Sequence, residues 1–106
     1  MMAYDGALAA RIRRSLAAAK HVEEKTMFDG LAFLVSGRIV CAVVNNNLMV
    51  RVGRGRYEAS LREPHVAAVG VKGAPTAGYV FVGPAGCRNE EHVAAWIDRA
   101  ISYASP

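Results

Sequence analysis

The fold class is decided by residues 27–53, which read MFDGLAFLVSGRIVCAVVNNNLMVRVG. Three apolar runs in this stretch have the length of β-strands, and they cover 31–35, 38–44 and 47–52. The pairs Ser36-Gly37 and Asn45-Asn46 separate the runs. Glycine and asparagine tolerate the positive φ angles that two-residue hairpin turns require. We therefore predict three consecutive antiparallel strands joined by tight turns.

The residues before this stretch predict a helix and a short strand. Asp5 is placed to cap a helix that runs to about residue 19, because a carboxylate oxygen accepts from the first free N–H groups. Leu8, Ile12 and Leu16 then share one stripe of the helix, which makes them core residues. Residues 22–28, VEEKTMF, mix polar and apolar side chains and predict a short strand.

The residues after the stretch predict a second short helix, a further strand and a last helix. The short helix covers 53–63 and stops at Pro64, because proline cannot continue a helix. We expect 65–78 to be irregular or weakly extended, and YVFV at 79–82 predicts a strand. Asn89 is placed to cap the last helix, whose first turn carries two glutamates that the helix dipole favours.

This order of elements predicts an α+β domain. Hairpin-linked strands between helices favour a two-layer α/β sandwich, in which an antiparallel meander sheet carries the helices on one face. The chain has 106 residues, so we expect a single domain over 1–106. No run approaches the ~18 apolar residues of a membrane helix, and no signal-peptide pattern is present. We therefore predict a cytoplasmic protein with no membrane partner.

Alternation along the strands assigns side chains to the two faces of the sheet. One face has no polar member, so we expect the helices to cover it; it holds Ala32, Leu34, Ile39, Cys41, Val43, Leu48, Val50 and Val52. The other face is largely apolar as well, and it holds Leu31, Phe33, Val35, Arg38, Val40, Ala42, Asn47, Met49 and Arg51. A three-residue loop at 45–47 instead of a two-residue turn would move every later side chain to the opposite face.

The second face has two interpretations. Monomers rarely leave a contiguous apolar patch in water, so either residues 66–78 or the first strand cover it, or it contacts another chain. Aromatic, methionine and arginine side chains are enriched in the cores of interfaces. The predicted interface therefore consists of Phe33, Arg38, Val40, Met49 and Arg51.

The basic residues suggest a site for an anion. The net charge is +4, and ten of the thirteen basic residues are arginine. Arg51, Arg54 and Arg56 crowd the predicted start of the helix at 53–63, where free N–H groups and guanidinium groups can bind a phosphate-type anion. The alternative is an ordinary solvated loop. A nucleic-acid surface that adds Arg11 and Arg14 has weak support, because Tyr57 is the only aromatic residue close to the loop.

No pattern in the sequence predicts catalysis or metal binding. Cys87 and His92 are a nucleophile and a base five residues apart, but catalysis would need them within hydrogen-bond reach and a third group to orient them, and the spacing alone does not indicate this. The three histidines share no spacing, and Cys41 and Cys87 do not form a zinc or disulfide pattern. The chain also lacks a G-x-G-x-x-G motif. We predict that the protein is not an enzyme and that it has no catalytic residue, cofactor or metal.

The ordered pattern along the chain resembles the TfoX N-terminal domain family. It consists of EKTMFDGLAFLVSGRIVCAVVNNNLMVRVG, then YEASLREPH, then G-x-P-x-x-G-Y-V-F-V, then AAWIDRAISYA. Members often read MFGG where this chain reads MFDG, and often have Met and Trp where it has Thr76 and Tyr79. The resemblance implies a secretion-chaperone-like fold of the YgaC/TfoX-N type, often seen as a homodimer.

The resemblance also limits the function to be expected. Longer members regulate competence genes together with the catabolite activator protein, and they carry a C-terminal domain that we do not expect here. Short members have no established biochemical activity. We therefore predict a non-enzymatic interaction or regulatory domain that forms a homodimer and binds a protein partner. The alternative is a protein that binds anions or nucleic acid through its arginine-rich loop.

Overall fold

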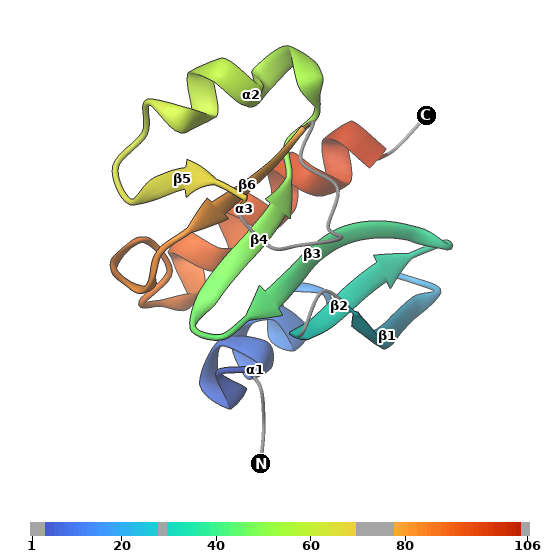
Figure 1. Cartoon of the computed structure of the whole chain (residues 1–106). Coiled ribbons are helices and arrows are strands. Elements are labelled where there is room, and N and C mark those ends of the chain that lie inside the picture. Colours follow the sequence, from blue (N-terminus) through green and yellow to red (C-terminus); the bar gives the residue numbers. More distant parts are fainter. Residues whose placement is uncertain (1–3, 28–29, 70–77, 105–106) are drawn as a thin grey trace.

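The computed structural model describes residues 4–27, 30–69 and 78–104, which form an α+β fold, as predicted (Figure 1). The helices in these residues are α1 (Gly6–Ser15), α2 (Arg54–Leu61), α3 (Glu90–Ala104) and the short 3-10 helix η1 (Pro84–Gly86). The strands are β1 (Val22–Met27), β2 (Gly30–Val35), β3 (Arg38–Val44), β4 (Asn47–Arg51), β5 (Val66–Ala68) and β6 (Tyr79–Val82).

The two predicted hairpin turns are confirmed. Val35 pairs with Arg38, and the turn residues Ser36 and Gly37 have φ angles of 52° and 80°. Positive φ at both central residues matches the right-handed twist of the flanking strands. In the second hairpin Val44 pairs with Asn47 across two turn residues, so the alternative of a three-residue loop is wrong.

The sheet is antiparallel throughout, in the order β1-β2-β3-β4-β6-β5. The meander prediction therefore holds for the first four strands. The chain then passes through α2 and β5 before β6 returns to pair with β4, which leaves β5 at the far edge (Figure 1). Residues 66–68 form a short strand, which agrees with the weakly extended alternative, and 70–77 lie outside the described residues.

Both predicted helix caps are present. The Asp5 Oδ1 oxygen accepts from the Ala7 and Leu8 N–H groups at 2.9 and 3.3 Å, which satisfies two free donors of α1. The Asn89 side-chain oxygen accepts from the His92 N–H at 2.9 Å at the start of α3. Helix α1 ends at Ser15, earlier than the predicted residue 19, and the chain continues in turns.

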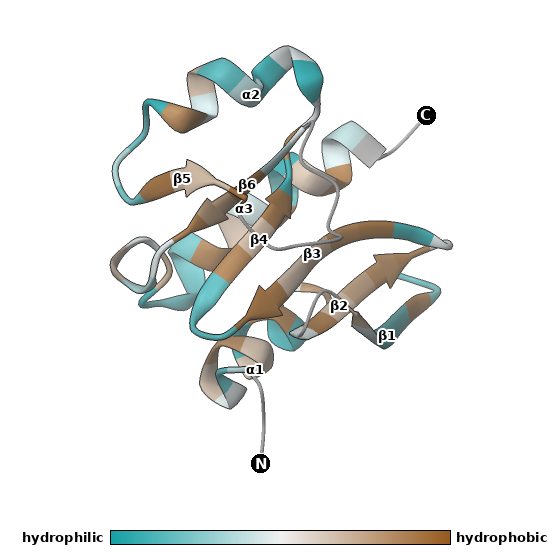
Figure 2. Ribbon diagram, in the orientation of Figure 1, coloured by the Kyte–Doolittle hydropathy of each residue, from teal (hydrophilic) through white to brown (hydrophobic). Residues whose placement is uncertain are grey.

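Helices α1 and α3 pack against each other on one face of the sheet, and α3 contacts β3 and β4. The core between these layers contains the α1 stripe Leu8, Ile12 and Leu16, as predicted, together with Trp96 and Ile97 of α3. Tyr57 and Leu61 of α2 pack against the same core. Figure 2 shows the hydrophobic colour concentrated along β2, β3 and β4, whereas α2 is mostly hydrophilic.

A β-bulge between β2 and β3 corrects the predicted assignment of faces. Leu34 pairs with Ile39, but the next residue, Phe33, pairs with Cys41, so Val40 has no opposite residue. Val40 and Cys41 then both point toward the helices. The prediction assumed regular alternation, and the extra residue breaks it.

The bulge exchanges two sets of residues between the faces. Leu31, Phe33, Val35 and Val40 belong to the helix-side core, although they were assigned to the other face. Conversely, Ala32, Leu34 and Ile39 belong to the helix-free face. The assignments of Cys41, Val43, Leu48, Val50 and Val52 to the helix side are confirmed.

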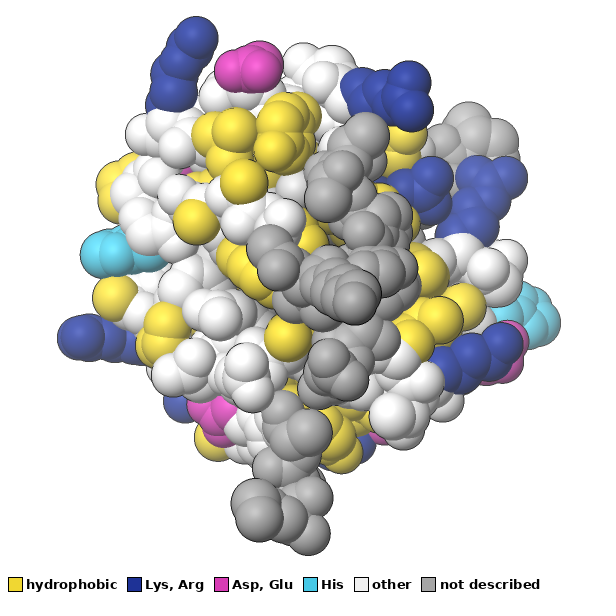
Figure 3. Space-filling model, in the orientation of Figure 1, with side chains coloured by type: hydrophobic (Ala, Val, Ile, Leu, Met, Phe, Trp, Pro, Cys, Tyr) yellow, Lys and Arg dark blue, Asp and Glu magenta, His cyan; other side chains and the backbone are white. Residues whose placement is uncertain are grey.

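The helix-free face has an apolar cluster of its own. Met49 and Ala42 are fully buried in it, and Tyr79, Val44 and Val69 join them. Figure 3 looks at this face: hydrophobic side chains are visible at several places, and Lys and Arg side chains lie mainly toward its rim. The first strand does not cover the face, because β1 extends the sheet beside β2. The other proposed cover, 66–78, lies largely outside the described residues.

Candidate anion-binding groove

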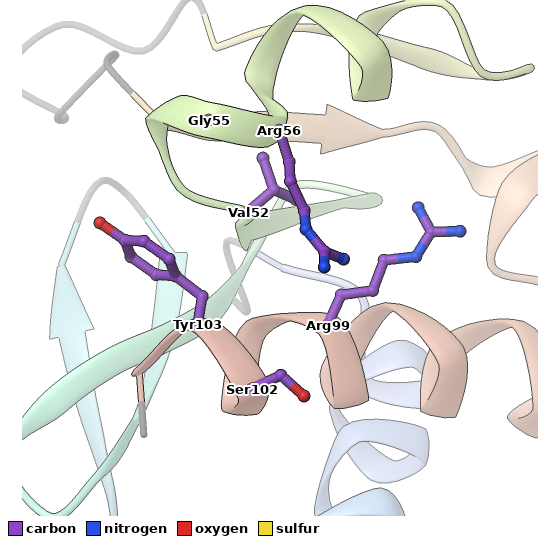
Figure 4. A pocket seen from close by; sticks show the side chains of 6 residues that line it. All are labelled: Val52, Gly55, Arg56, Arg99, Ser102 and Tyr103. Carbon is purple, nitrogen blue, oxygen red and sulfur yellow. The ribbon is translucent and has the colours of Figure 1, made fainter. Parts of the chain in front are cut away.

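A groove of about 350 Å³ opens between the start of α2 and the last turns of α3. Its lining combines apolar, hydroxyl and guanidinium groups from Val52, Gly55, Arg56, Arg99, Ser102 and Tyr103. Figure 4 shows the Arg56 side chain descending from α2 toward α3, while the Arg99 side chain borders the same space and directs its guanidinium group away from Tyr103. Two cationic side chains from helices distant in sequence therefore line one half-open hollow.

The wall of the groove on the β4 side depends on Gly53. This residue has φ 86° and ψ 156°, a conformation that is essentially restricted to glycine. A Cβ atom at this position would lie 2.4 Å from two carbons of the Tyr103 ring. The bare Gly53 backbone thus lets the Tyr103 ring approach the chain closely where β4 leads into α2.

Tyr103 also holds an arginine in place. The Arg51 guanidinium carbon lies 4.9 Å from the centre of the Tyr103 ring, a cation–π contact. Arg51 itself pairs with Tyr79 in the sheet, on the helix-free side. The ring therefore separates Arg51 from the groove, and Arg51 adds positive charge near the site without lining it.

The two arginines that line the groove differ in their contacts. Arg99 donates to the Glu63 carboxylate at 2.6 Å and lies over the Trp96 ring, 4.3 Å from its centre. These contacts fix its position and neutralise part of its charge. Arg56 is exposed, and it has no acidic partner among the residues that the structure describes. Arg56 is therefore the cation that is available to an incoming anion.

The sequence located the region of this site but only part of its residues. Of the three predicted residues, Arg56 lines the groove, Arg51 stacks behind Tyr103, and Arg54 begins α2 outside the lining. Sequence reasoning missed Arg99 and Tyr103, because they lie on the last helix, far along the chain. Arg99 gave no signal beyond its place on the polar side of α3, and Tyr103 fits the apolar stripe of that helix, so neither position identifies a binding residue.

Two of the three arginines of α1 have acidic partners, and the third, Arg11, lines a separate, smaller hollow together with Arg88. Arg13 makes two hydrogen bonds of 2.8 Å with the Glu24 carboxylate of β1. This hydrogen-bonded pair lowers the pKa of Glu24 and raises that of Arg13. Arg14 forms an ion pair with Glu90 of α3. The predicted contribution of Arg14 to an anion-binding surface is therefore weakened, because its charge is already paired.

The predicted interface does not form a single surface. Phe33 and Val40 are fully buried beneath the helices, whereas Met49 is fully buried on the opposite face. Of the two arginines assigned to it, Arg51 contacts Tyr103, and Arg38 is an exposed residue at the start of β3. The correction follows from the β-bulge, which turns Phe33 and Val40 away from Met49.

The cysteine–histidine pair has no catalytic geometry. Cys87 is buried, and its thiol donates to the Gly83 carbonyl at 3.3 Å. Burial raises the pKa of this thiol, although Arg11 nearby lowers it in part. The thiol borders a smaller hollow of about 190 Å³ that Arg11 and Arg88 also line, whereas His92 is exposed on α3 and does not line it. A nucleophile needs the thiolate, and this site disfavours that form.

Two absences hold for the described residues, 4–27, 30–69 and 78–104. Among them, no group of three or more Cys, His, Asp or Glu side chains is arranged to hold a metal ion. In the same part of the chain, no helix combines the length and the apolar content that crossing a bilayer requires.

Comparison with protein families matches residues 14–104 to the TfoX N-terminal domain. The match begins within α1 and ends at the last residue of α3, so it includes the whole sheet and the groove. It agrees with the resemblance seen in the sequence pattern. A search of curated proteins found no match.

Proposed function

Because the chain belongs to the TfoX N-terminal domain family, we propose that it is a non-enzymatic interaction domain that binds the carboxylates of an acidic protein segment. The observation that carries the proposal is the pair Arg56 and Arg99, whose side chains line one groove from two helices (Figure 4). Planar guanidinium groups bind carboxylates through two parallel hydrogen bonds. Arg56 is free to do so, and Arg99 is held in position by Trp96 and Glu63.

The other groove residues favour a protein segment over a nucleic acid. Val52 and Tyr103 give the groove an apolar wall, which suits the aliphatic part of a peptide side chain. Nucleic-acid binding depends on many phosphate contacts along a basic stripe. Arg13 and Arg14 do not extend such a stripe over α1, because both have glutamate partners. The experiment below distinguishes binding of an acidic protein segment from binding of a nucleic acid.

The homodimer expected from the family is part of the proposal. Its originally predicted surface is not available as one patch, because Phe33 and Val40 are buried beneath the helices. A cytoplasmic location and the lack of enzymatic activity are also predictions. The second is supported by the raised pKa of Cys87 and by the position of His92 outside the hollow that Cys87 borders.

The test uses a short fluorescein-labelled oligoglutamate and a single-stranded DNA of matched charge, titrated at low salt. Trp96, the single tryptophan, lies under Arg99 and gives a second signal at the groove. Arg56→Gln should weaken oligoglutamate binding about ten- to hundredfold, since a hydrogen bond to a charged group contributes about 1.5–3 kcal/mol.

Arg62→Gln is the matched control, because it removes the same charge from the other end of α2, outside the groove. Equal losses for both variants would show attraction to net charge alone and would contradict the site. No oligoglutamate binding by the wild type refutes the proposal. Tighter binding of DNA, with a steep fall as salt rises, favours the nucleic-acid alternative instead.

A further inference from the structure

Strand β1 leaves one edge of the sheet open. It is the outermost strand beside β2, and β5 forms the opposite edge (Figure 1). Its first five residues are exposed, and no strand among the described residues pairs with its outer side. β1 has six residues and β5 has three, so β1 is the longer edge. An open edge presents backbone N–H and C=O groups that another strand can bind.

The backbone groups that face outward can be identified from the register. The Ser36 N–H donates to the His21 carbonyl at 3.0 Å, which shows that His21 directs its backbone toward β2. Because the direction alternates along an antiparallel strand, the residues that direct their backbone away from β2 are Val22, Glu24 and Thr26. The outer edge therefore offers three evenly spaced bonding positions.

We propose that β1 pairs with β1 of a second copy of this chain, antiparallel and centred on Glu24, so that one sheet continues through both copies. The proposal rests on the homodimer part of the proposed function and names its surface. In this register Val22 bonds to Thr26 of the second copy, and Glu24 lies opposite its own counterpart. All three outward-facing positions are then used.

The charges on β1 select this register over its neighbours. Glu23 lies opposite Lys25 of the second copy, and by symmetry Lys25 lies opposite the second Glu23. These residues occupy the pairs without backbone hydrogen bonds, where cross-strand side chains approach most closely. A shift to the adjacent symmetric registers places Glu23 opposite Glu23, or Lys25 opposite Lys25, and like charges directly opposite are destabilising.

The two Glu24 side chains near the axis do not oppose the pairing strongly. Glu24 lies on the helix side of the sheet, opposite Phe33 in β2, and Arg13 of its own chain binds both of its oxygens at 2.8 Å. Each Glu24 thus enters the interface as half of an ion pair. Glu23 and Lys25 lie on the other face, beside Leu34 and Ala32, so they meet each other without interference from α1.

The same charges protect the edge against other partners. Charged residues on an edge strand discourage pairing with arbitrary strands, because most strands cannot match them. A second copy of β1 matches them in one register. The edge therefore fits self-association more closely than it fits an unrelated β-strand.

Charge reversal tests the interface without disturbing the fold, because Glu23 and Lys25 are exposed. Glu23→Lys alone places Lys opposite Lys, and Lys25→Glu alone places Glu opposite Glu. Each single variant should raise the dimer dissociation constant on the order of tenfold or more, from two reversed cross-strand pairs. The readout is sedimentation velocity over a dilution series at low salt, with circular dichroism to confirm folding.

Two restorations make the test specific. The double variant Glu23→Lys/Lys25→Glu recovers both opposite-charge pairs and should dimerise like the wild type. An equal mixture of the two single variants should also dimerise, because each then meets the opposite charge. A merely structural effect of either substitution would not be rescued by mixing.

The remaining outcomes each overturn a defined part of the inference. A wild type that stays monomeric at every concentration refutes both the β1 surface and the homodimer. Dimers that resist both reversals refute the β1 surface and leave the homodimer in place. Failure of the mixture to dimerise, with both variants folded, refutes the register centred on Glu24. The groove is tested separately by Arg56→Gln, which does not touch β1.

Discussion

Gly53→Ala should destabilise the protein strongly, because the substitution meets two separate obstacles. The backbone conformation, φ 86° and ψ 156°, costs a residue with a Cβ about 1–3 kcal/mol. The new Cβ would also lie 2.4 Å from the Tyr103 ring, which must swing away. Tyr103 is 47% exposed, so it has room to move, and it then loses its stacking on Arg51, about 0.5–1 kcal/mol. We expect a total loss of about 1.5–4 kcal/mol.

A double-mutant cycle separates the two obstacles. Tyr103→Ala should cost about 1–2 kcal/mol, from partial loss of apolar burial and of the cation–π contact. In that background Gly53→Ala meets only the backbone strain, so the double variant should be more stable than the sum of the single effects by about 1 kcal/mol. The assay is urea unfolding followed by Trp96 fluorescence, with the midpoint compared at constant slope.

Gly55→Ala is the matched control within the same segment. Its Cβ would meet no atom within 4 Å, and Gly55 lies inside α2. Alanine is the better helix former by up to about 1 kcal/mol, so this variant should be neutral or more stable. If the loss of unfolding free energy in Gly53→Ala is smaller than the gain in Gly55→Ala, the proposed strain at Gly53 is wrong. If the cycle is additive, the Tyr103 ring does not rest on Gly53.

Three further predictions concern the core, the thiols and the pH dependence. Phe33→Ala should cost about 3–5 kcal/mol in urea unfolding, because the side chain is fully buried under the helices, and Phe33→Asp should leave the chain unfolded; a folded Phe33→Asp protein would contradict the bulge. Cys41 and Cys87 should react with a thiol reagent far more slowly in the native protein than in urea, because burial raises both pKa values; a rate near that of free cysteine would contradict this. Glu24→Gln should cost less than about 1 kcal/mol at neutral pH, because the pair with Arg13 is exposed. The pKa of Glu24 is lowered on folding, so its contribution is present above the ordinary value of 4.5 and disappears as the pH falls through the folded pKa. Stability measured against pH for the wild type and Glu24→Gln should therefore converge in acid, whereas Glu58→Gln, which removes a carboxylate with no ion pair among the described residues, should follow the wild type throughout.

Local chemistry made several parts of the fold predictable. Ser36-Gly37 and Asn45-Asn46 specify their turns through the φ angles that these residues tolerate, so β3 begins and ends where the sequence indicates. Asp5 and Asn89 cap helices because their side chains satisfy nearby N–H groups. Each of these signals acts over a few residues, and each is visible in one short segment.

The candidate site was only partly predictable, because it joins distant segments. Arg56 was identified from the arginine cluster at 51–56, but Arg99 reaches the groove only because α3 packs across β3 and β4. The pairing of β6 with β4 is similarly distant, and no turn sequence specifies it. Sequence reasoning could therefore name the cationic loop, but not the helix that faces it.

The sequence by itself determined the α+β class, the hairpins and the family of residues 14–104. Only the tertiary structure decided which face Phe33 and Val40 occupy. The reason is that β2 and β3 are apolar on both faces. A shift of the register by one residue moves one set of apolar side chains off the helix side and puts another apolar set in its place. The hydrophobic pattern of the sequence does not distinguish between the two registers. The tertiary structure selects one register, because Val40 and Cys41 at the bulge both pack into the core beneath α1 and α3.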